Sequence, residues 1–455
     1  MFVKTKRWIG LLIAGVILLL FACLPEGAGL TRPMLTAAGL LLASLWVWIS
    51  EVLPMSVSIL GMIGVAILGG LLSLEEAFCR LDVKTALFIL CSAAIATAVG
   101  LSNIPQRITR WMLKRSRGHS GVFIMGFGMV VTLCSAIMSS LATCAMFAGI
   151  VNSMLGVRRS NLKRCLMIII PACAGIGGFI TPAGTPANLL LLSLLESQDI
   201  PLTFVQWCLI GFPAGLLTAF LFLLSVLVWF HPSLDDLQPL LSEPMAASPH
   251  RDQLTMVVVA FVLLGWVISS WIPGLQLWHV ACLGMIIMLL PGVSLLQLRD
   301  LPRQIHWDLV ITMGTIGILM GTVTDSGLAA WCSERLLAPL IPLPLPLLLP
   351  CLSCFICFIR TLIPTTTGTV SLLAPVLLSV CMLTGLDPSV VFMVLGFWTA
   401  SAMLVVWTEP IYLLTWSRRD YSPGDLFKAG IIPTLFMSFL GVWLIRALAM
   451  LVIGS

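Results

Sequence analysis

The hydrophobic positions of this chain fall in runs of about 20 residues that are separated by short polar segments. About 20 apolar residues is the length that an α-helix needs to cross the hydrocarbon core of a bilayer. Residues 8–24, 35–49 and 254–270 are clear examples. The pattern predicts an all-α, polytopic membrane protein with about 11 transmembrane helices plus two re-entrant hairpins.

Composition supports this class. Hydrophobic residues make up 59% of the chain and charged residues 9%, and the mean hydropathy is +1.10. A soluble domain carries roughly 25% charged residues. No polar stretch exceeds about 25 residues, whereas the smallest domains need roughly 50. The chain therefore has no room for a soluble catalytic domain. Because further spans follow residues 8–24, we interpret that run as a retained first helix and not as a signal peptide.

The chemistry-bearing residues do not form an enzyme motif. The 14 cysteines lie mostly in apolar runs, where a free thiol acts as a small hydrophobe. Cys351, Cys354 and Cys357 come nearest to metal-ligand spacing, but no histidine lies near them. There is no phosphate-binding loop, dinucleotide fingerprint or nucleophile–base pattern. We expect neither enzymatic activity, nor a nucleic-acid partner, nor a cofactor other than a coupling ion.

Basic residues predict the orientation, because they mark cytoplasmic loops. They cluster at residues 4–7, 107–117, 158–164, 299–303 and 418–419. When these clusters are used to assign the side of each loop, the topology is that of a multi-pass protein of the inner membrane, with a cytoplasmic N-terminus and the C-terminus outside. Apolar residues recur at helical spacing in the second cluster, so we expect an amphipathic helix on the inner surface there.

Two apolar segments predict re-entrant hairpins. Residues 122–157 lie between two basic clusters, so both ends are cytoplasmic, and the middle holds Ser139, Ser140 and Thr143 where two full crossings would need a solvated loop. A hairpin that turns inside the membrane fits this pattern, although a plain helical pair remains an alternative. The second hairpin, residues 343–383, starts and ends outside.

Two further apolar helices are predicted to be broken. Residues 165–196 contain a glycine- and proline-rich interruption at 177–188, and residues 389–417 contain a shorter one at 407–410. Unwound backbone at membrane depth is tolerated only where protein buries it or it lines a wet cavity. Two breaks in corresponding places in two halves indicate the binding site of a transporter built from inverted repeats.

The predicted domains follow from this repeat. They are N-terminal scaffold helices (1–84), a first repeat (85–230) with hairpin 122–157 and broken helix 165–196, a linker (231–253), scaffold helices of the second half (254–305), and a second repeat (306–455) with hairpin 343–383 and broken helix 389–417.

Several motifs resemble the divalent anion/sodium symporter family, the carriers of dicarboxylates, citrate and sulfate. The motifs are Trp48 to Pro54, His306-Trp307-Asp308, Ser139-Ser140-Leu141 and Thr365-Thr366-Thr367 at the hairpin tips, and Gly184-Thr185-Pro186-Ala187-Asn188 and Thr408-Glu409-Pro410 at the breaks. The resemblance implies alternating access, a small anionic substrate and a homodimer in the lipid bilayer. Ser140 and Thr366 replace the asparagine that the family has at each tip.

The candidate site consists of the tips and breaks. Helix N-termini attract anions through free N–H groups and the helix dipole, and hydroxyls add donors. The substrate-binding candidates are Ser139, Ser140, Leu141, Thr185, Pro186, Thr365, Thr366, Thr367 and Thr408. The family's sodium sites, carried over by resemblance, comprise Ser135, Ser139, Ser140, Gly184, Asn188, Thr361 and Thr366. Coupling to Na⁺, to H⁺ or to exchange of a second anion stays open.

Two charges lie deep in these segments. Arg360 precedes the second tip, and Glu409 lies in the second break. An ionisable residue near the bilayer centre costs about 3 kcal/mol on insertion scales, so it is functional or paired. Arg360 is a candidate counter-charge for the substrate and Glu409 a candidate proton acceptor, while a structural Arg360–Glu409 pair is the alternative. A cation/proton antiporter or arsenite-type permease, and a receptor on a transporter fold, remain rival functions.

Overall fold

The structure is a computed structural model of the chain. It describes residues 2–454 except 28, 51, 117, 156–159, 234–248, 273, 298, 300, 302–304, 306, 338, 341, 364 and 418. Several predictions fall on the residues left out, among them the predicted linker for most of its length and the charged residues Glu51, Arg158, Arg159, Arg303 and Arg418. These predictions lie outside the described residues.

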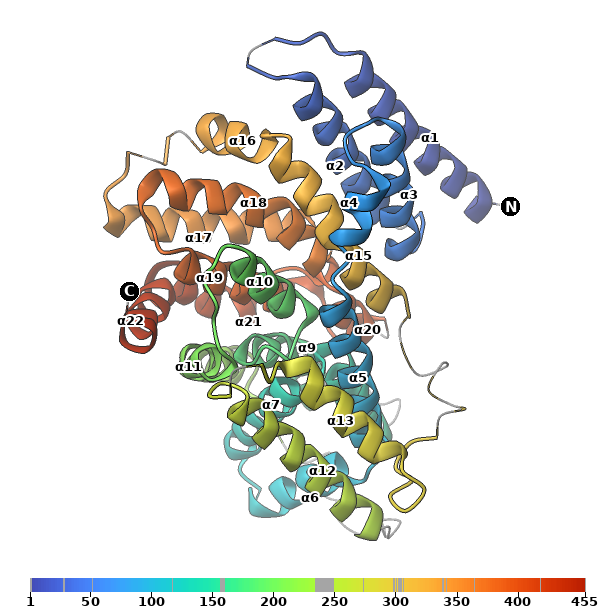
Figure 1. Ribbon diagram of the computed structural model, residues 1–455. Coiled ribbons are helices and arrows are strands. Elements are labelled where there is room, and N and C mark those ends of the chain that lie inside the picture. The colour runs from blue at the N-terminus through green and yellow to red at the C-terminus, as the bar shows by residue number, and fades with distance from the viewer. Residues whose placement is uncertain are drawn as a thin grey trace.

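The regular elements of the described part are helices, which confirms the predicted all-α class (Figure 1). The helices of the first half are α1 (Phe2–Cys23), α2 (Arg32–Ser50), α3 (Met55–Leu68), α4 (Leu74–Cys79), α5 (Val83–Gly100), α6 (Ile104–Arg115), α7 (Ser120–Ile137), α8 (Ser140–Leu155), α9 (Asn161–Ile180), α10 (Pro186–Ser197) and α11 (Phe204–Phe230). Those of the second half are α12 (Pro249–Ile268), α13 (Leu277–Leu289), α15 (Trp307–Asp325), α16 (Leu328–Leu336), α17 (Leu345–Leu362), α18 (Thr366–Thr384), α19 (Pro388–Ala400), the short turn η2 (Val406–Thr408), α20 (Pro410–Trp416), α21 (Pro423–Phe436), the π-turn η3 (Met437–Gly441) and α22 (Val442–Ile453).

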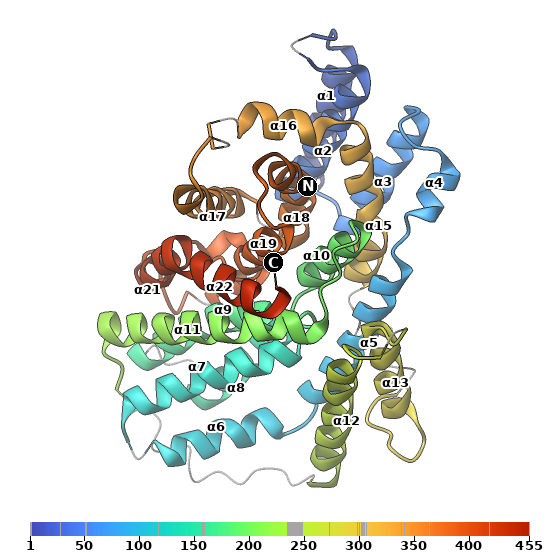
Figure 2. The same ribbon diagram turned by 60° about the vertical axis from the view of Figure 1, so that its left-hand side comes forward.

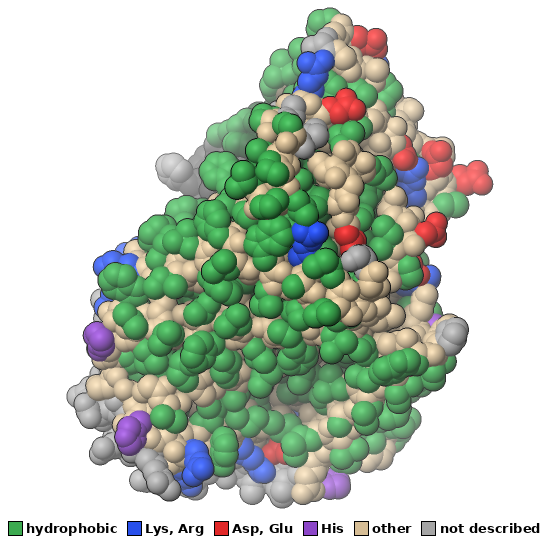
Figure 3. Space-filling view, turned by 90° about the vertical axis from the view of Figure 1, so that its left-hand side faces the viewer, with side chains coloured by type: hydrophobic (Ala, Val, Ile, Leu, Met, Phe, Trp, Pro, Cys, Tyr) green, Lys and Arg blue, Asp and Glu red, His purple; other side chains and the backbone are tan. Residues whose placement is uncertain are grey.

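The surface fits a lipid environment. Nine helices in the described part are long and apolar enough to cross a membrane. Hydrophobic side chains cover most of the face seen in Figure 3, and acidic side chains gather at its upper right. Large apolar side chains such as Leu68, Leu451 and Trp271 are well exposed, which in water would be unfavourable over so wide an area. The protein is therefore a multi-pass membrane protein, as predicted. The number of crossings, their orientation and the division into domains stay predictions.

Helix α9 lies at the centre of the molecule. Nearly all its residues are buried, and it packs against α7, α8, α11, α19 and α20. Figure 2 shows α7, α8 and α11 alongside one another, with α6 beyond them. Helix α9 approaches α19 closely at Gly175, where an ideal Cβ would lie 2.4 Å from the carbonyl oxygen of Ala400. The broken helices of the two halves are thus in direct contact.

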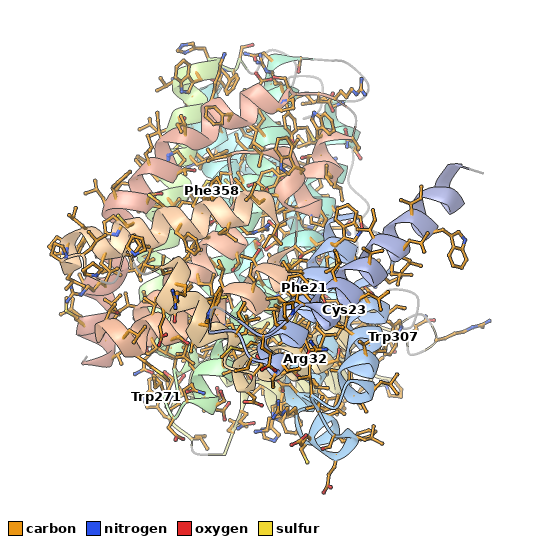
Figure 4. The ribbon with its side chains drawn as sticks, turned by 90° about the horizontal axis from the view of Figure 1, so that it is seen from above. Phe21, Cys23, Arg32, Trp271, Trp307 and Phe358 are labelled. Atoms are coloured by element: carbon orange, nitrogen blue, oxygen red, sulfur yellow. The ribbon has the colours of Figure 1, made fainter. Side chains whose placement is uncertain are left out.

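The first two helices form an antiparallel pair at one edge of the molecule. The side chain of Arg32 donates to the carbonyl of Leu24 (3.0 Å), and its backbone N–H donates to the Glu26 carboxylate (3.1 Å). Figure 4 shows Arg32 and Cys23 at the connection between α1 and α2. Further along the pair, the indole N–H of Trp46 donates to the carbonyl of Gly10 (3.1 Å). Polar contacts at both places hold α1 against α2.

Three boundaries differ from the sequence-based expectations. The second break is wider than 407–410, because the helix ends at Ala400 and resumes only at Pro410. Helix α12 begins at Pro249, inside the predicted linker. The polar residues around Glu75 and Glu76 belong to a short helix, α4. A capping box starts it: the Ser73 hydroxyl accepts from the backbone N–H of Glu76 (3.1 Å), and the Glu76 carboxylate accepts from the backbone N–H of Ser73 (2.7 Å).

Candidate functional site

The first hairpin tip lies directly on the first break. The extended backbone at Met138 separates α7 from α8. The backbone N–H of Ser140 donates to the carbonyl of Gly184 at 3.3 Å, and the Ser140 hydroxyl lies 3.5 Å from the same oxygen. The hydroxyl of Thr181, at the end of α9, donates to the carbonyl of Ala136 at the end of α7. The tip and the break therefore form one polar unit.

Asn188 holds the first break in shape. It is fully buried as the third residue of α10, and its side-chain N–H₂ group donates to the carbonyls of Gly178 (2.9 Å) and Thr181 (2.8 Å), with Phe179 O at 3.4 Å. These carbonyls have lost their helical partners, because the helix stops at Ile180. A single neutral amide thus satisfies the end of α9.

Two glycines permit this close packing. An ideal Cβ on Gly184 would lie 2.4 Å from the carbonyl oxygen and 2.8 Å from the Cα of Gly178. A Cβ on Gly178 would lie 2.2 Å from the hydroxyl oxygen of Ser140 and 2.6 Å from a methyl carbon of Thr185. Only glycine leaves space for the tip and the two sides of the break to meet.

Buried oxygen atoms collect beside this contact. The Ser135 hydroxyl donates to the carbonyl of Ala174 (2.6 Å) and lies 3.4 Å from the Ser140 hydroxyl. The side-chain oxygens of Asn188 and Thr185 are buried and have no hydrogen-bond partner among the described residues. Unpartnered buried oxygens are costly, and uncharged oxygen ligands suit hard cations. The first half thus offers oxygen atoms that a small cation could use.

The second tip and break are joined through Arg360. This residue lies in the last turn of α17 and its side chain is fully buried (0% exposed). Its Nη1 group donates to the carbonyls of Ile363 and Thr408, both at 2.6 Å, and its Nε group donates to that of Thr399 at 3.3 Å. Its Nη2 atom is 3.9 Å from the Glu409 carboxylate. Arg360 therefore contacts Glu409 weakly and the main chain strongly.

Most hydroxyls of the second half are turned into the protein. Thr361 donates to carbonyls of its own helix, Thr408 donates to the carbonyl of Val405 (2.9 Å), and Thr367 contacts the sulfur of Met55 (3.2 Å). Thr365 and Thr366 are half-buried. In the first half Leu141 is 36% exposed, whereas Thr185 is 4% exposed. The half-exposed candidates are Ser139, Pro186, Thr365 and Thr366, and the buried ones are Ser140, Thr185, Thr367 and Thr408.

The two hairpin tips and the two helix breaks are linked to one another by contacts between the helices that start at them. Helix α8, which starts at the first tip, packs against α20, which starts at the second break. The thiol of Cys144 on α8 lies 3.4 Å from the carbonyl of Ile411 on α20. Helix α10, which starts at the first break, packs against α18, which starts at the second tip. The structure therefore brings all the sequence-predicted segments together around α9 and α19.

Two ion pairs at the start of α9 were not predicted as such from the sequence. Lys163 is 2% exposed and lies 3.5 Å from the Asp420 carboxylate, and Arg164 pairs with Asp425. In the sequence, Lys163 belongs to a basic cluster, which is typical of a solvated loop, so nothing signalled its burial. These pairs connect the first broken helix to the segment that follows the second one.

Comparison with solved structures supports a transporter fold. The structure of the YdaH transporter from Alcanivorax borkumensis matches this chain with a TM-score of 0.56 at 14% identity, covering 99% of this chain and 98% of that one. At this identity the likeness shows a shared fold, and the class that the structure defines is a multi-pass helical membrane protein with broken helices.

Sequence relatives refine that class. The profile of the citrate transporter (CitMHS) family matches residues 45–349 and 277–454, so the chain belongs to the citrate transporter family. An uncharacterized transporter of Methanocaldococcus jannaschii is 25% identical over 437 residues, 94% of this chain and 95% of that protein. A sodium-dependent high-affinity dicarboxylate transporter of Caenorhabditis elegans is 21% identical over 461 residues, 89% of this chain and 81% of that protein. These relatives confirm the resemblance to dicarboxylate carriers.

Proposed function

We propose that this chain is a secondary active transporter of small anions, namely di- or tricarboxylates or sulfate, that works by alternating access. The observation that supports the proposal is the contact of both hairpin tips with both helix breaks. Four helices (α8, α10, α18 and α20) begin at these segments, and free N–H groups at helix N-termini attract anions. The half-exposed Ser139 at the first hairpin tip and Thr366 at the second supply neutral donors at the two tips.

The predicted inverted repeat also suggests which parts of the carrier move and which stay fixed. We propose that the hairpins and broken helices move together against a scaffold made of residues 1–84 and 254–305. The contacts of Ser140 with Gly184, and of Arg360 with Thr408, join each tip to its break and support movement as one body. We also propose that the scaffold forms a homodimer in the inner membrane, with the N-terminus in the cytoplasm and the C-terminus outside.

An anion screen tests the substrate class. Purified protein is heated in the presence of citrate, succinate, malate, tartrate or sulfate, with and without Na⁺ and at several pH values. A ligand that binds only the folded state at about 100 times its Kd adds about 2.7 kcal/mol to the free energy of unfolding and raises Tm. We expect at least one of the five anions to raise Tm, and the uncharged analogue succinamide to have no effect. If none of them does so under any condition, the proposal fails.

Coupling is proposed to involve Na⁺ or H⁺. The uncharged oxygens of Ser135, Ser140 and Asn188 support a Na⁺ site in the first half. Glu409 supports a proton route, because the residue is only 8% exposed and one of its carboxylate oxygens has no hydrogen-bond partner among the described residues. The charged and titratable groups facing it are Arg360 of α17, Cys144 of α8 and Tyr412 of α20.

Glu409→Gln is expected to remove the pH dependence of uptake. Protonation of Glu409 removes a negative charge that would repel an anion, so uptake by the wild type should rise as the pH falls. Glutamine mimics the protonated form, so the variant should bind the anion equally well at acid and alkaline pH. Substrate exchange across liposomes at several pH values measures this. An unchanged pH profile would exclude Glu409 from coupling.

A further inference from the structure

The polar surroundings of Arg360 resemble those of a bound cation. Its guanidinium is enclosed by protein, and three main-chain carbonyls accept its hydrogen bonds. Ile363 belongs to the second hairpin tip, Thr399 precedes the second break, and Thr408 ends it. Carbonyls freed by helix breaks are the groups with which transporters coordinate Na⁺ at the bilayer midplane. In the second half of the molecule, these carbonyls instead accept hydrogen bonds from a positively charged side chain of the protein itself.

The two halves differ in the charge of the group that fills this place. Helices α10 and α20 both begin with proline, and their third residues are Asn188 and Tyr412. In the first half the neutral Asn188 amide holds the carbonyls of the break. In the second half Tyr412 makes no such contact, since its hydroxyl has no hydrogen-bond partner among the described residues. The positively charged Arg360 holds the break instead.

The two hairpins differ in the same way. Arg360 lies five residues before Thr365, and in the first hairpin Cys134 lies five residues before Ser139. The first half therefore has no arginine at the corresponding position. It has unpartnered buried oxygens on Asn188 and Thr185 in its place. The first half can accept a free cation, whereas the second half already contains a covalently attached one.

We propose that the guanidinium of Arg360 is a fixed cation that occupies the cation position of the second tip and break, so that the carrier binds a free metal cation only in its first half. The nearby Glu409 carboxylate, 3.9 Å from Nη2, adds a negative charge that favours a cation at this position. The inference rests on the proposed carrier function, because a coupling cation matters only to a carrier. It concerns the binding of the cation and not that of the anion.

The proposal predicts chemical rescue of Arg360→Ala. Removal of the side chain leaves three carbonyls and a carboxylate without their cation, so the Tm of the full-length protein should fall. Addition of guanidinium at millimolar concentration, or of Na⁺, should raise the Tm again in a saturable manner. At a cation concentration about ten times Kd, the ratio of folded to unfolded protein should rise about tenfold. Choline, which is too large for the site, should have no effect.

Two further variants keep the test decisive. Arg360→Lys retains the positive charge, so it should remain close to the wild type and gain nothing from guanidinium. Arg80→Ala is the matched control, because Arg80 pairs with Asp325 at an exposed position (2.5 Å) away from both breaks. It should respond to Na⁺ as the wild type does and should gain nothing from guanidinium. If Arg360→Ala does not fold, a folded Arg360→Lys with wild-type cation dependence supports the proposal.

Three outcomes would overturn it. The first is a Tm of Arg360→Ala equal to that of the wild type. The second is a destabilised Arg360→Ala that neither guanidinium nor Na⁺ restores. The third is an Arg360→Lys variant that fails to fold, which would mean that the shape of the guanidinium matters and not its charge. The cations are added as chloride salts and no candidate substrate anion is present. The result therefore does not depend on whether the protein transports an anion.

Discussion

Gly184→Ala is expected to abolish anion uptake. The added Cβ would lie 2.4 Å from the carbonyl oxygen of Gly178 and 2.8 Å from its Cα, and both contacts are with backbone atoms. Overpacking a buried site costs about 1–3 kcal/mol and displaces the backbone. Ser140 is hydrogen-bonded to Gly184, so the displacement would also move the first hairpin tip. Uptake by proteoliposomes measures the loss.

Controls separate this effect from a general defect. Gly149 lies on α8, in the arm that follows the first tip, and a Cβ there would meet nothing within 4 Å. Gly149→Ala should therefore transport like the wild type. In Gly178→Ala the closest contact is the Ser140 hydroxyl (2.2 Å), so adding Ser140→Gly should restore part of the lost Tm. Ser140→Gly should not rescue Gly184→Ala. Equal uptake by Gly184→Ala and Gly149→Ala would show that the tip and break need not touch.

Asn188→Ala is expected to destabilise the first break and to reduce uptake by more than about tenfold, the factor that 1.4 kcal/mol produces. The substitution leaves the carbonyls of Gly178 and Thr181 buried without a donor. Each unsatisfied buried group costs about 1–3 kcal/mol. The end of α9 should therefore shift from the position that meets the hairpin tip. Tm and proteoliposome uptake are measured together.

Asn161→Ala is the matched control for this variant. Asn161 also lies on the first broken helix, at the start of α9, where its side-chain N–H₂ group donates to the carbonyl of Phe230 (2.6 Å). Asn161 is exposed, and its loss removes one hydrogen bond at the end of α9 opposite the break. We expect a small drop in Tm and nearly normal uptake. If Asn188→Ala behaves like Asn161→Ala, the amide does not hold the break.

The sequence could predict the site where local chemistry causes the irregular backbone. Glycine and proline interrupt the helix at residues 177–188, and Pro410 starts α20, so both breaks were visible. Ser139 and Ser140 in an apolar run indicated the first tip. These signals are local, because each depends on the residue's own backbone preferences or on its polarity against apolar neighbours.

The sequence could not predict features that depend on distant contacts. Residues 401–405 contain no glycine or proline, yet they are not helical. The structure gives the reason: Arg360 takes the carbonyls of Thr399 and Thr408, and Gly430 allows α21 to approach Met403, where a Cβ would lie 2.2 Å from the carbonyl oxygen. The sequence also could not predict which way the threonine hydroxyls point, since a threonine in a helix can donate to a carbonyl of its own helix, as Thr361 does.

Uptake of a labelled anion by proteoliposomes tests the central claim most directly. Purified protein is reconstituted, and entry of labelled succinate, citrate and sulfate is followed under an inward Na⁺ gradient, an inward H⁺ gradient, or with unlabelled anion trapped inside. We expect at least one anion to enter faster than into protein-free liposomes, excess unlabelled anion to compete with it, and Gly184→Ala to abolish the signal. Entry no faster than into protein-free liposomes, for all three anions under all three conditions, would contradict it.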